Sequence, residues 1–195
     1  MHHASLSADD RALLSIAARS IAHGMAQGAP LPIEEAQLSA ALSAPGACFV
    51  TLNSKGELRG CIGSILPRRP LAIDVAANAF AAAFNDMRFP AMTESELPSL
   101  EIEISVLSPL TKIADESEAE LLRALRPHVD GLVLSDSSRR GVFLPQVWDH
   151  LPVPAEFVAA LKRKAGFDAW DWPDDMQAER FTVREVGPQP IGAIA

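Results

Sequence analysis

The chain has 195 residues, of which 48% are hydrophobic, and its formal net charge is −8. This length and apolar content are enough for a folded core, and they exclude an intrinsically disordered chain. Because binding to nucleic acids or anionic membranes needs clustered Lys and Arg, the acidic balance argues against both kinds of partner, and no apolar run reaches the ~20 residues of a membrane span.

The amino terminus, MHHASLSADD, predicts the start of a helix and not a secretory signal. A signal peptide would show basic residues followed by an apolar run, and two cysteines make no disulfide framework, so we expect a cytoplasmic protein. Ser7 is a typical N-cap, apolar residues follow it at helical spacing, and Gly24 is expected to end the helix. His2 and His3 are assigned no chemistry.

The stretch ACFVTLNSKGELRGCIGS predicts a β-hairpin, because two extended runs flank a turn signal. Pro70 suits the first position of the helix that follows, PLAIDVAANAFAAAFND, whose apolar residues form two adjoining stripes. A helix as apolar as this one is expected to pack closely on a sheet.

In the second half, SLEIEISVLSP alternates apolar and polar residues, which predicts a strand with one buried face. ESEAELLRALRP predicts a short helix, DGLVLSDSSRRGVFLPQV a second hairpin, and ERFTVREV a final strand. A further helix is expected to begin at Pro154 and to be capped by Gly166. Strands and helices follow one another without a regular βαβ rhythm, so the expected fold class is α+β, with antiparallel sheets and packed helices.

The cysteine in GELRGCIGSILPRRP lies in a setting that favours a reactive thiol. Alternate side chains of a strand share a face, so Arg59 and Cys61 would lie together with their Cα atoms roughly 6.7 Å apart. A guanidinium so close favours a thiolate, and Gly60 and Gly63 would let backbone or ligand approach it. The stretch is basic in an acidic chain, which suits an anionic ligand such as a carboxylate or phosphate. The alternative is a half-buried structural cysteine beside surface arginines.

Cys48, on the other strand of the hairpin, allows another interpretation. If the turn is centred between Ser54 and Lys55, Cys48 lies opposite Cys61, within reach of a disulfide. A bulge or a different turn length would abolish this pairing. The residues alone therefore leave a reactive thiol, a redox pair and a structural cysteine open.

The remaining candidates outside the hairpin carry less weight. Arg88 in NDMRFP is expected to pair with Asp86 or to contact an anion, while Glu101 and Glu103 are more typical of a solvated strand face than of an acid–base pair. No metal or cofactor is expected, because the histidines show no metal-ligand spacing and GCIG matches no phosphate-binding loop. Of the histidines, His150 is the candidate partner for a Cys–His pair.

The segment FVTLNSKGELRGCIGS resembles the hallmark of the AMMECR-one domain family, whose bacterial and archaeal members are called AmmeMemoRadiSam system protein A. AAFNDMRFPAMTESEL, LEIEISVLSP, GVFLPQV and KAGFDAW resemble further segments of that family in the same order, so the similarity covers most of the chain. Met87 stands where the family usually has proline. Cys48 stands at a position that does not look fixed in the family, which weakens the disulfide. His150 stands where acidic residues are common, which weakens the Cys–His pair.

The resemblance implies one α+β domain over residues 1–195, with a larger and a smaller lobe and the LRGCIG cysteine near the cleft between them. We expect the smaller lobe around residues 46–66 plus 128–150. Carried over motif by motif, Cys61 and Arg59 are the candidate catalytic residues. The candidate substrate- or anion-binding residues are Gly60, Ile62, Gly63, Arg88, Phe89 and Gln146.

The resemblance also implies association with a Memo-like protein and a radical S-adenosylmethionine (SAM) protein, without a settled activity. In one hypothesis, Cys61 is the nucleophile of a thiol-dependent enzyme or carrier acting on a small anionic or peptide-like substrate. Arg59 would activate the thiol, and the backbone from Gly60 to Gly63 would hold the anion. In the other hypothesis, the chain is a non-catalytic module that docks a Memo-like or radical SAM partner. The sequence names no substrate, reaction or oligomeric state.

Overall fold

The computed structural model describes residues 6–114 and 117–194, and the chain divides into two compact units. The first unit comprises Met1–Leu107 and Arg184–Ala195, and the second comprises Ser108–Val183. His2 and His3, to which no chemistry was assigned, lie outside the described residues.

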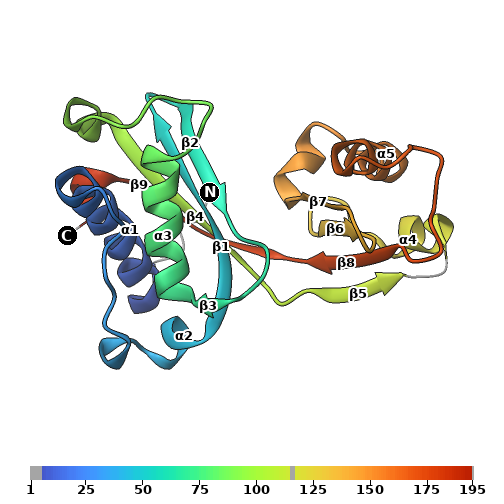
Figure 1. Ribbon diagram of the computed structural model, residues 1–195, viewed down its shortest axis with the longest axis horizontal. Helices are drawn as coiled ribbons and strands as arrows, with labels where there is room; N and C mark the ends of the chain where they lie inside the picture. Colours follow the sequence, from blue (N-terminus) through green and yellow to red (C-terminus); the bar gives the residue numbers. More distant parts are fainter. Residues whose placement is uncertain (1–5, 115–116, 195) are drawn as a thin grey trace. The chain divides into compact units, whose positions relative to one another are not determined.

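The first unit is built on an antiparallel sheet with strand order β2-β1-β4-β9. Its strands are β1 (Pro45–Ser54), β2 (Glu57–Gly63), β4 (Leu100–Leu107) and β9 (Val183–Pro190), with the short β3 (Arg69–Pro70) paired to β1. Helices α1 (Ala8–Gln27) and α3 (Leu71–Phe84) cover one face of this sheet (Figure 1). The core between them contains the apolar side of β4 that the sequence pattern predicted.

Short elements complete the first unit. They are η1 (Glu35–Gln37), α2 (Ala40–Ser43), η2 (Glu94–Ser99) and η4 (Ile191–Ala193). The N-cap of α1 is Ser7, as predicted, and its hydroxyl accepts a hydrogen bond from the backbone N–H of Asp10. Gly24 does not end the helix, because the left-handed cap is Gly28; a Cβ at Gly24 would meet the rings of Phe80 and Phe84.

The register of the predicted hairpin differs from the one that would join the cysteines. The turn lies at Lys55 and Gly56, which both have positive φ, and before it the register shifts at a β-bulge between Leu52 and Asn53. Such a two-residue turn matches the twist of the flanking strands. Cys61 consequently pairs with Thr51, and both cysteines are free thiols. The Cys48–Cys61 pairing, which the sequence left open as one of three interpretations, is therefore excluded.

The second unit is a four-stranded antiparallel sheet with order β5-β8-β6-β7. Its strands are β5 (Thr111–Ala114), β6 (Gly131–Ser135), β7 (Arg140–Phe143) and β8 (Gln177–Phe181), and its helices are α4 (Glu118–Ala124), η3 (Pro145–Asp149) and α5 (Pro154–Ala165). The predicted second hairpin is β6–β7, and Gly166 caps α5 in the left-handed conformation, as expected. Trp148 is buried in this core and stacks on Phe157 with ring centroids 3.7 Å apart.

The fold class is α+β, as predicted, but the division of the chain differs from the expected lobes. Residues 128–150 belong to the second unit, whereas residues 46–66 belong to the first because β1 pairs with β4 along its whole length. The single strand expected from ERFTVREV is split at Thr182 into β8 and β9, which belong to different sheets.

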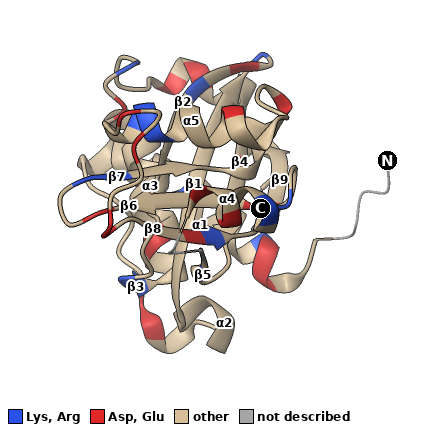
Figure 2. Ribbon diagram, turned by 90° about the vertical axis from the view of Figure 1, so that its right-hand side faces the viewer, with Lys and Arg blue, Asp and Glu red and all other residues tan. Residues whose placement is uncertain are grey.

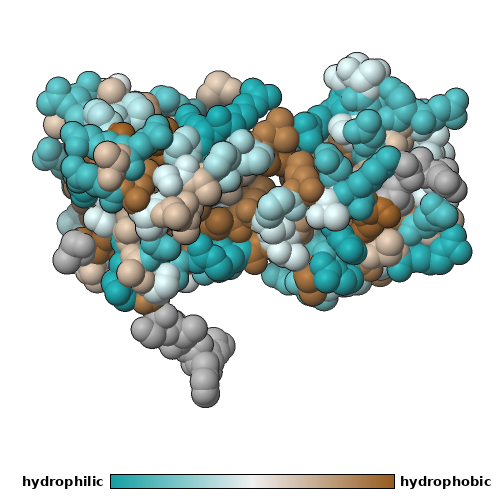
Figure 3. Space-filling view, turned by 90° about the horizontal axis from the view of Figure 1, so that it is seen from below, coloured by the Kyte–Doolittle hydropathy of each residue, from teal (hydrophilic) through white to brown (hydrophobic). Residues whose placement is uncertain are grey.

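The surface of the protein is mostly polar, because the apolar side chains are collected in the two cores. Most of the surface seen in Figure 3 is hydrophilic, and the large apolar side chains of both sheets are buried. None of the helices in the described part of the chain is long and apolar enough to cross a membrane.

Candidate functional site

Cys61 lies in β2, the edge strand of the first sheet, and its side chain is only half-buried. Its ladder partner Thr51 donates a hydrogen bond from Oγ1 to the Cys61 Sγ over 3.3 Å. The register therefore brings the thiol together with a group that sequence reasoning missed, although Thr51 stands inside the quoted FVTL segment.

The free edge of β2 at Cys61 is closed by an ion pair. Asp86 accepts a hydrogen bond from the Cys61 backbone N–H over 2.9 Å, and Arg88 Nη2 donates to the Cys61 carbonyl over 3.2 Å. The two side chains are joined by Arg88 Nη2 and Asp86 Oδ2 at 2.7 Å. Together they satisfy the backbone groups of an edge strand that would otherwise be unpaired. The Arg88 guanidinium thus contacts the backbone of Cys61 directly.

The Asp86–Arg88 pair is electrostatically strong. Asp86 is buried, and hydrogen bonds from Arg88 hold the pKa of its carboxyl well below the usual range despite desolvation. Asp86 in turn raises the pKa of Arg88, and the nearby Cys61 thiol adds to that rise. The sequence had offered this arginine as an ion-pair or an anion-contact residue, and the structure shows the ion pair.

Arg59 is engaged by other groups. Its Nε lies 2.5 Å from Glu96 Oε1, and its Nη2 donates to the Pro90 carbonyl over 2.9 Å. The hydrogen bond from Arg59 lowers the pKa of Glu96 to about 2. The guanidinium carbons of Arg59 and Arg88 lie 5.7 and 5.5 Å from the centroid of the Phe89 ring. Arg59 thus joins β2 to the segment that carries Arg88 and Phe89.

The glycines around Cys61 are required by packing. A Cβ at Gly60 would lie 2.1 Å from the carbonyl oxygen of Ala82 in α3, and one at Gly63 would lie 2.2 Å from the Phe49 ring. The side-chain spaces of both glycines are therefore filled by the protein itself, and Gly60 to Gly63 form a strand and not a loop. Ile62 packs against the core of the first unit.

The other candidates lie in the second unit. Gln146 is exposed in η3, and His150 is exposed directly after the same element.

The basic residues of the described chain are interspersed with acidic ones along the ribbon (Figure 2). The local excess of positive charge read around Cys61 is consequently reduced by Asp86 and Glu96, which come from a segment that is distant in sequence.

Cys48 lies in a buried polar network on the other side of β1. Asp74 Oδ2 accepts hydrogen bonds from the Cys48 backbone N–H at 3.1 Å and from Asn78 Nδ2 at 2.9 Å. It also accepts one from Ser64 Oγ at 2.5 Å, while Arg69 Nε reaches the Asp74 Oδ1 over 2.8 Å. Burial, together with the negative charge of Asp74, raises the pKa of Cys48 well above that of a free thiol. This thiol is therefore structural.

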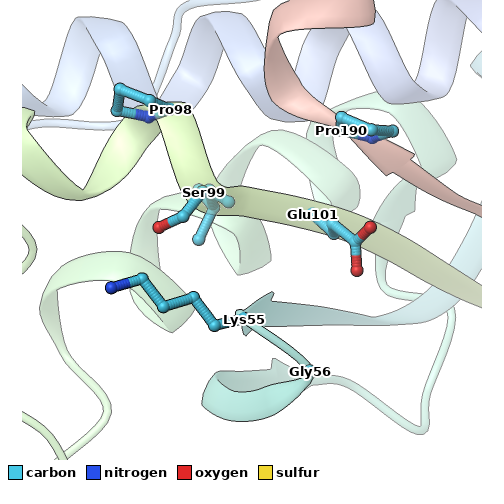
Figure 4. Close-up of a pocket in the computed structure, with 7 residues that line it drawn as sticks. Lys55, Gly56, Pro98, Ser99, Glu101 and Pro190 are labelled. Carbon is cyan, nitrogen blue, oxygen red and sulfur yellow. The ribbon is translucent and has the colours of Figure 1, made fainter.

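A hollow of about 310 Å³ lies at the turn end of the first sheet (Figure 4). Lys55 extends from the β1–β2 turn and Glu101 from β4, while Pro98 and Pro190 lie along the rim. Glu101 is the ladder partner of Asn53. It precedes by two residues Glu103, the partner of Thr51, and Thr51 in turn pairs with Cys61.

Comparisons with known proteins agree with the motif resemblance. The family model AMMECR1 matches residues 14–186. A protein of Thermotoga maritima is 39% identical over 137 residues, covering 69% of this chain and 74% of the relative. One from Aeropyrum pernix is 34% identical and covers 93% of this chain and 81% of the relative. The crystal structure of the uncharacterized protein PH0010 from Pyrococcus horikoshii matches with a TM-score of 0.78 and 31% identity, over 89% of this chain and 88% of that one.

Proposed function

This chain belongs to the AMMECR1 family, and from that premise we propose that it is a cytoplasmic, thiol-dependent component of the AmmeMemoRadiSam system. It would act on a small anionic or peptide-like molecule, with Cys61 as the nucleophile and a Memo-like and a radical SAM protein as partners. The observation that carries the proposal is the half-exposed Cys61 thiol, which accepts a hydrogen bond from Thr51 in the family's hallmark segment.

The surroundings of Cys61 support this proposal in two ways. The Asp86–Arg88 pair holds the backbone of Cys61 from the open edge, so the thiol is kept in one position relative to the sheet. The Arg88 side chain is 56% exposed, so its guanidinium also remains reachable by an anionic group of a substrate. In this form of the proposal Arg88 acts beside the thiol, while Arg59 positions the Phe89 segment.

The experiment that tests the proposal compares metabolite profiles of three strains. One lacks the gene, one carries Cys61→Ser, and one carries Cys48→Ser as the matched control for loss of a thiol. We expect Cys61→Ser to accumulate the same metabolites as the deletion, because a hydroxyl replaces the nucleophile. A wild-type profile for Cys61→Ser, with a changed profile for the deletion, would rule out thiol chemistry.

The second candidate is a docking module without catalysis, and one observation favours it. Met87 is fully exposed between Asp86 and Arg88, so an apolar side chain projects into solvent beside the Cys61 strand. Under this candidate, Met87→Asp abolishes co-purification with the Memo-like or radical SAM protein, while the exposed Trp170→Asp serves as the control. Unchanged co-purification with Met87→Asp would exclude docking at this turn.

A further inference from the structure

The hollow at the turn end of the first sheet forms where the ladder between β1 and β4 stops. The last paired residues of that ladder are Ser54 and Leu100. Beyond them the chain of β1 turns back toward β2 at Lys55 and Gly56, while the chain that enters β4 comes from η2. The buried Leu100 side chain belongs to the inner wall. Because the lining comes from the ends of β1, β4 and β9, the sheet holds the hollow in shape.

Two opposite charges line this hollow. In the part of the chain that the structure describes, neither the Lys55 ammonium nor the Glu101 carboxylate has a hydrogen-bond or ion-pair partner. In Figure 4 the Lys55 side chain extends toward the side of Pro98 and Ser99. The Glu101 carboxylate lies on the other side, that of Pro190. The two groups therefore do not pair with each other, and they give the hollow a positive and a negative end.

Lysine is an unusual residue for the backbone conformation at position 55. Lys55 has a φ of 54°, and Gly56 has a φ of 81°. Two-residue hairpin turns with positive φ at both positions favour Asn, Asp or Gly, because a longer side chain makes the left-handed conformation costly. Formation of the turn consequently does not account for an ammonium group at this hollow.

The separation of the two charges sets the length of a matching ligand. Glu101 is the ladder partner of Asn53, and Lys55 follows Asn53 by two residues. Such diagonal neighbours on adjacent strands lie roughly 8 Å apart, and the two side chains diverge from there (Figure 4). A free amino acid carries its ammonium and carboxylate on one carbon, so it reaches one end only. Three extended residues span roughly 10 Å and can reach both ends.

We propose that this hollow binds a short peptide of about three residues with free termini, whose carboxylate contacts Lys55 and whose ammonium contacts Glu101. The volume of about 310 Å³ suits a ligand of this size, since small-molecule pockets begin at roughly 300 Å³. Pro98 and Pro190 present rigid apolar surfaces at the rim, on which the side chains of the peptide pack. Cys61 does not line the hollow, so this binding is separate from the proposed thiol function.

Titration of the full chain with tri-alanine tests the proposal. Amide NMR spectra should show saturable shifts at Lys55, Gly56 and Glu101, from which the dissociation constant follows. Tri-alaninamide lacks the carboxylate, and N-acetyl-tri-alanine lacks the ammonium. Each should bind roughly 10-fold more weakly than tri-alanine, because each loses one charge-assisted contact. Free alanine should also bind more weakly, since it reaches one end of the hollow only.

Variants of the two charged residues assign each end of the peptide. Lys55→Met should bind tri-alanine and tri-alaninamide equally, because it lacks the partner of the carboxylate. Glu101→Gln should bind tri-alanine and its N-acetyl form equally, because it lacks the partner of the ammonium. Glu57→Gln removes a carboxylate next to the same turn but outside the hollow, so it is the matched control and should keep the wild-type preferences. Cys61→Ser should bind tri-alanine as the wild type does.

Three results would overturn the inference. One is the absence of a saturable shift with tri-alanine, and another is equal affinity of the wild-type chain for the free, amidated and acetylated peptides. The third is a loss of affinity in Glu57→Gln as large as that in Glu101→Gln, because general attraction between opposite charges would then explain the binding. All three leave the proposed thiol function standing, because that function is tested at Cys61.

Discussion

The two cysteines belong to the same hairpin but have opposite surroundings. Cys48 is fully buried beside the Asp74 carboxylate, while Cys61 is half-exposed on the outer face beside Thr51 and the Arg88 guanidinium. A buried thiol next to a negative charge resists ionisation and is shielded from reagents, whereas the half-exposed Cys61 thiol is accessible from solvent. In this hairpin the face and the neighbours of a cysteine, and not its presence, determine whether it can react.

The largest expected effect is on alkylation. In the native protein iodoacetamide should modify Cys61 at least ~10³-fold faster than Cys48, because burial removes both the thiolate and the access of the reagent. Peptide mass spectrometry over a time course measures both rates in one sample. The unfolded chain is the control, in which the two rates should converge. Similar native rates at the two cysteines would mean that their surroundings do not set their reactivity.

The next effect is on stability at the Cys48 network. Asp74→Ala should lower the free energy of unfolding by about 3 kcal/mol, because several buried donors lose their acceptor and Arg69 loses its partner. Urea unfolding measures the change, and Cys48 should become open to alkylation in the same variant. Glu57→Ala, at an exposed position of β2, is the control and should stay within about 0.5 kcal/mol of the wild type.

A somewhat smaller loss is expected at the glycine before Cys61. Gly60→Ala should cost about 2 kcal/mol, because its Cβ would overlap the backbone oxygen of Ala82 and β2 would have to move away from α3. Gly192→Ala adds the same methyl group where no atom lies within 4 Å, so it isolates the packing cost. Equal unfolding free energies for the two variants would mean that Gly60 is not needed for packing.

The smallest effect is the pH dependence of the stability that the Asp86–Arg88 pair provides at the Cys61 backbone. The folded state holds the pKa of Asp86 below its usual value, so this stabilisation is complete above the unfolded pKa of about 3.9 and is lost as the pH falls. Solvent around the half-exposed Arg88 limits the contribution to the order of 1 kcal/mol. Urea unfolding at pH 6 and at pH 3 should therefore show a smaller loss for Asp86→Asn than for the wild type. An equal loss of unfolding free energy in both proteins would mean that the Asp86 carboxylate does not stabilise the fold.

Several elements were predictable from local pattern alone. Ser7 caps α1, the alternating LEIEISVL segment forms β4 with its apolar side in the core, and Gly166 ends α5. Each of these features depends on side chains within a few residues of one another, and the fold class follows from their order. The α1 end was misplaced because Gly24 is kept small by Phe80 and Phe84, residues that local pattern does not connect with it.

The α+β class, the family and the place of Cys61 in an extended, glycine-flanked segment all follow from the amino-acid sequence. The groups that surround that thiol follow from the packing of the folded chain. A one-residue change in the turn and a bulge replaced Cys48 by Thr51 as its partner, since strand register depends on turn geometry and not on composition. Likewise Asp86 and Glu96 reach β2 from a segment distant in sequence, because tertiary packing, and not spacing along the chain, decides which loop covers the edge of a sheet.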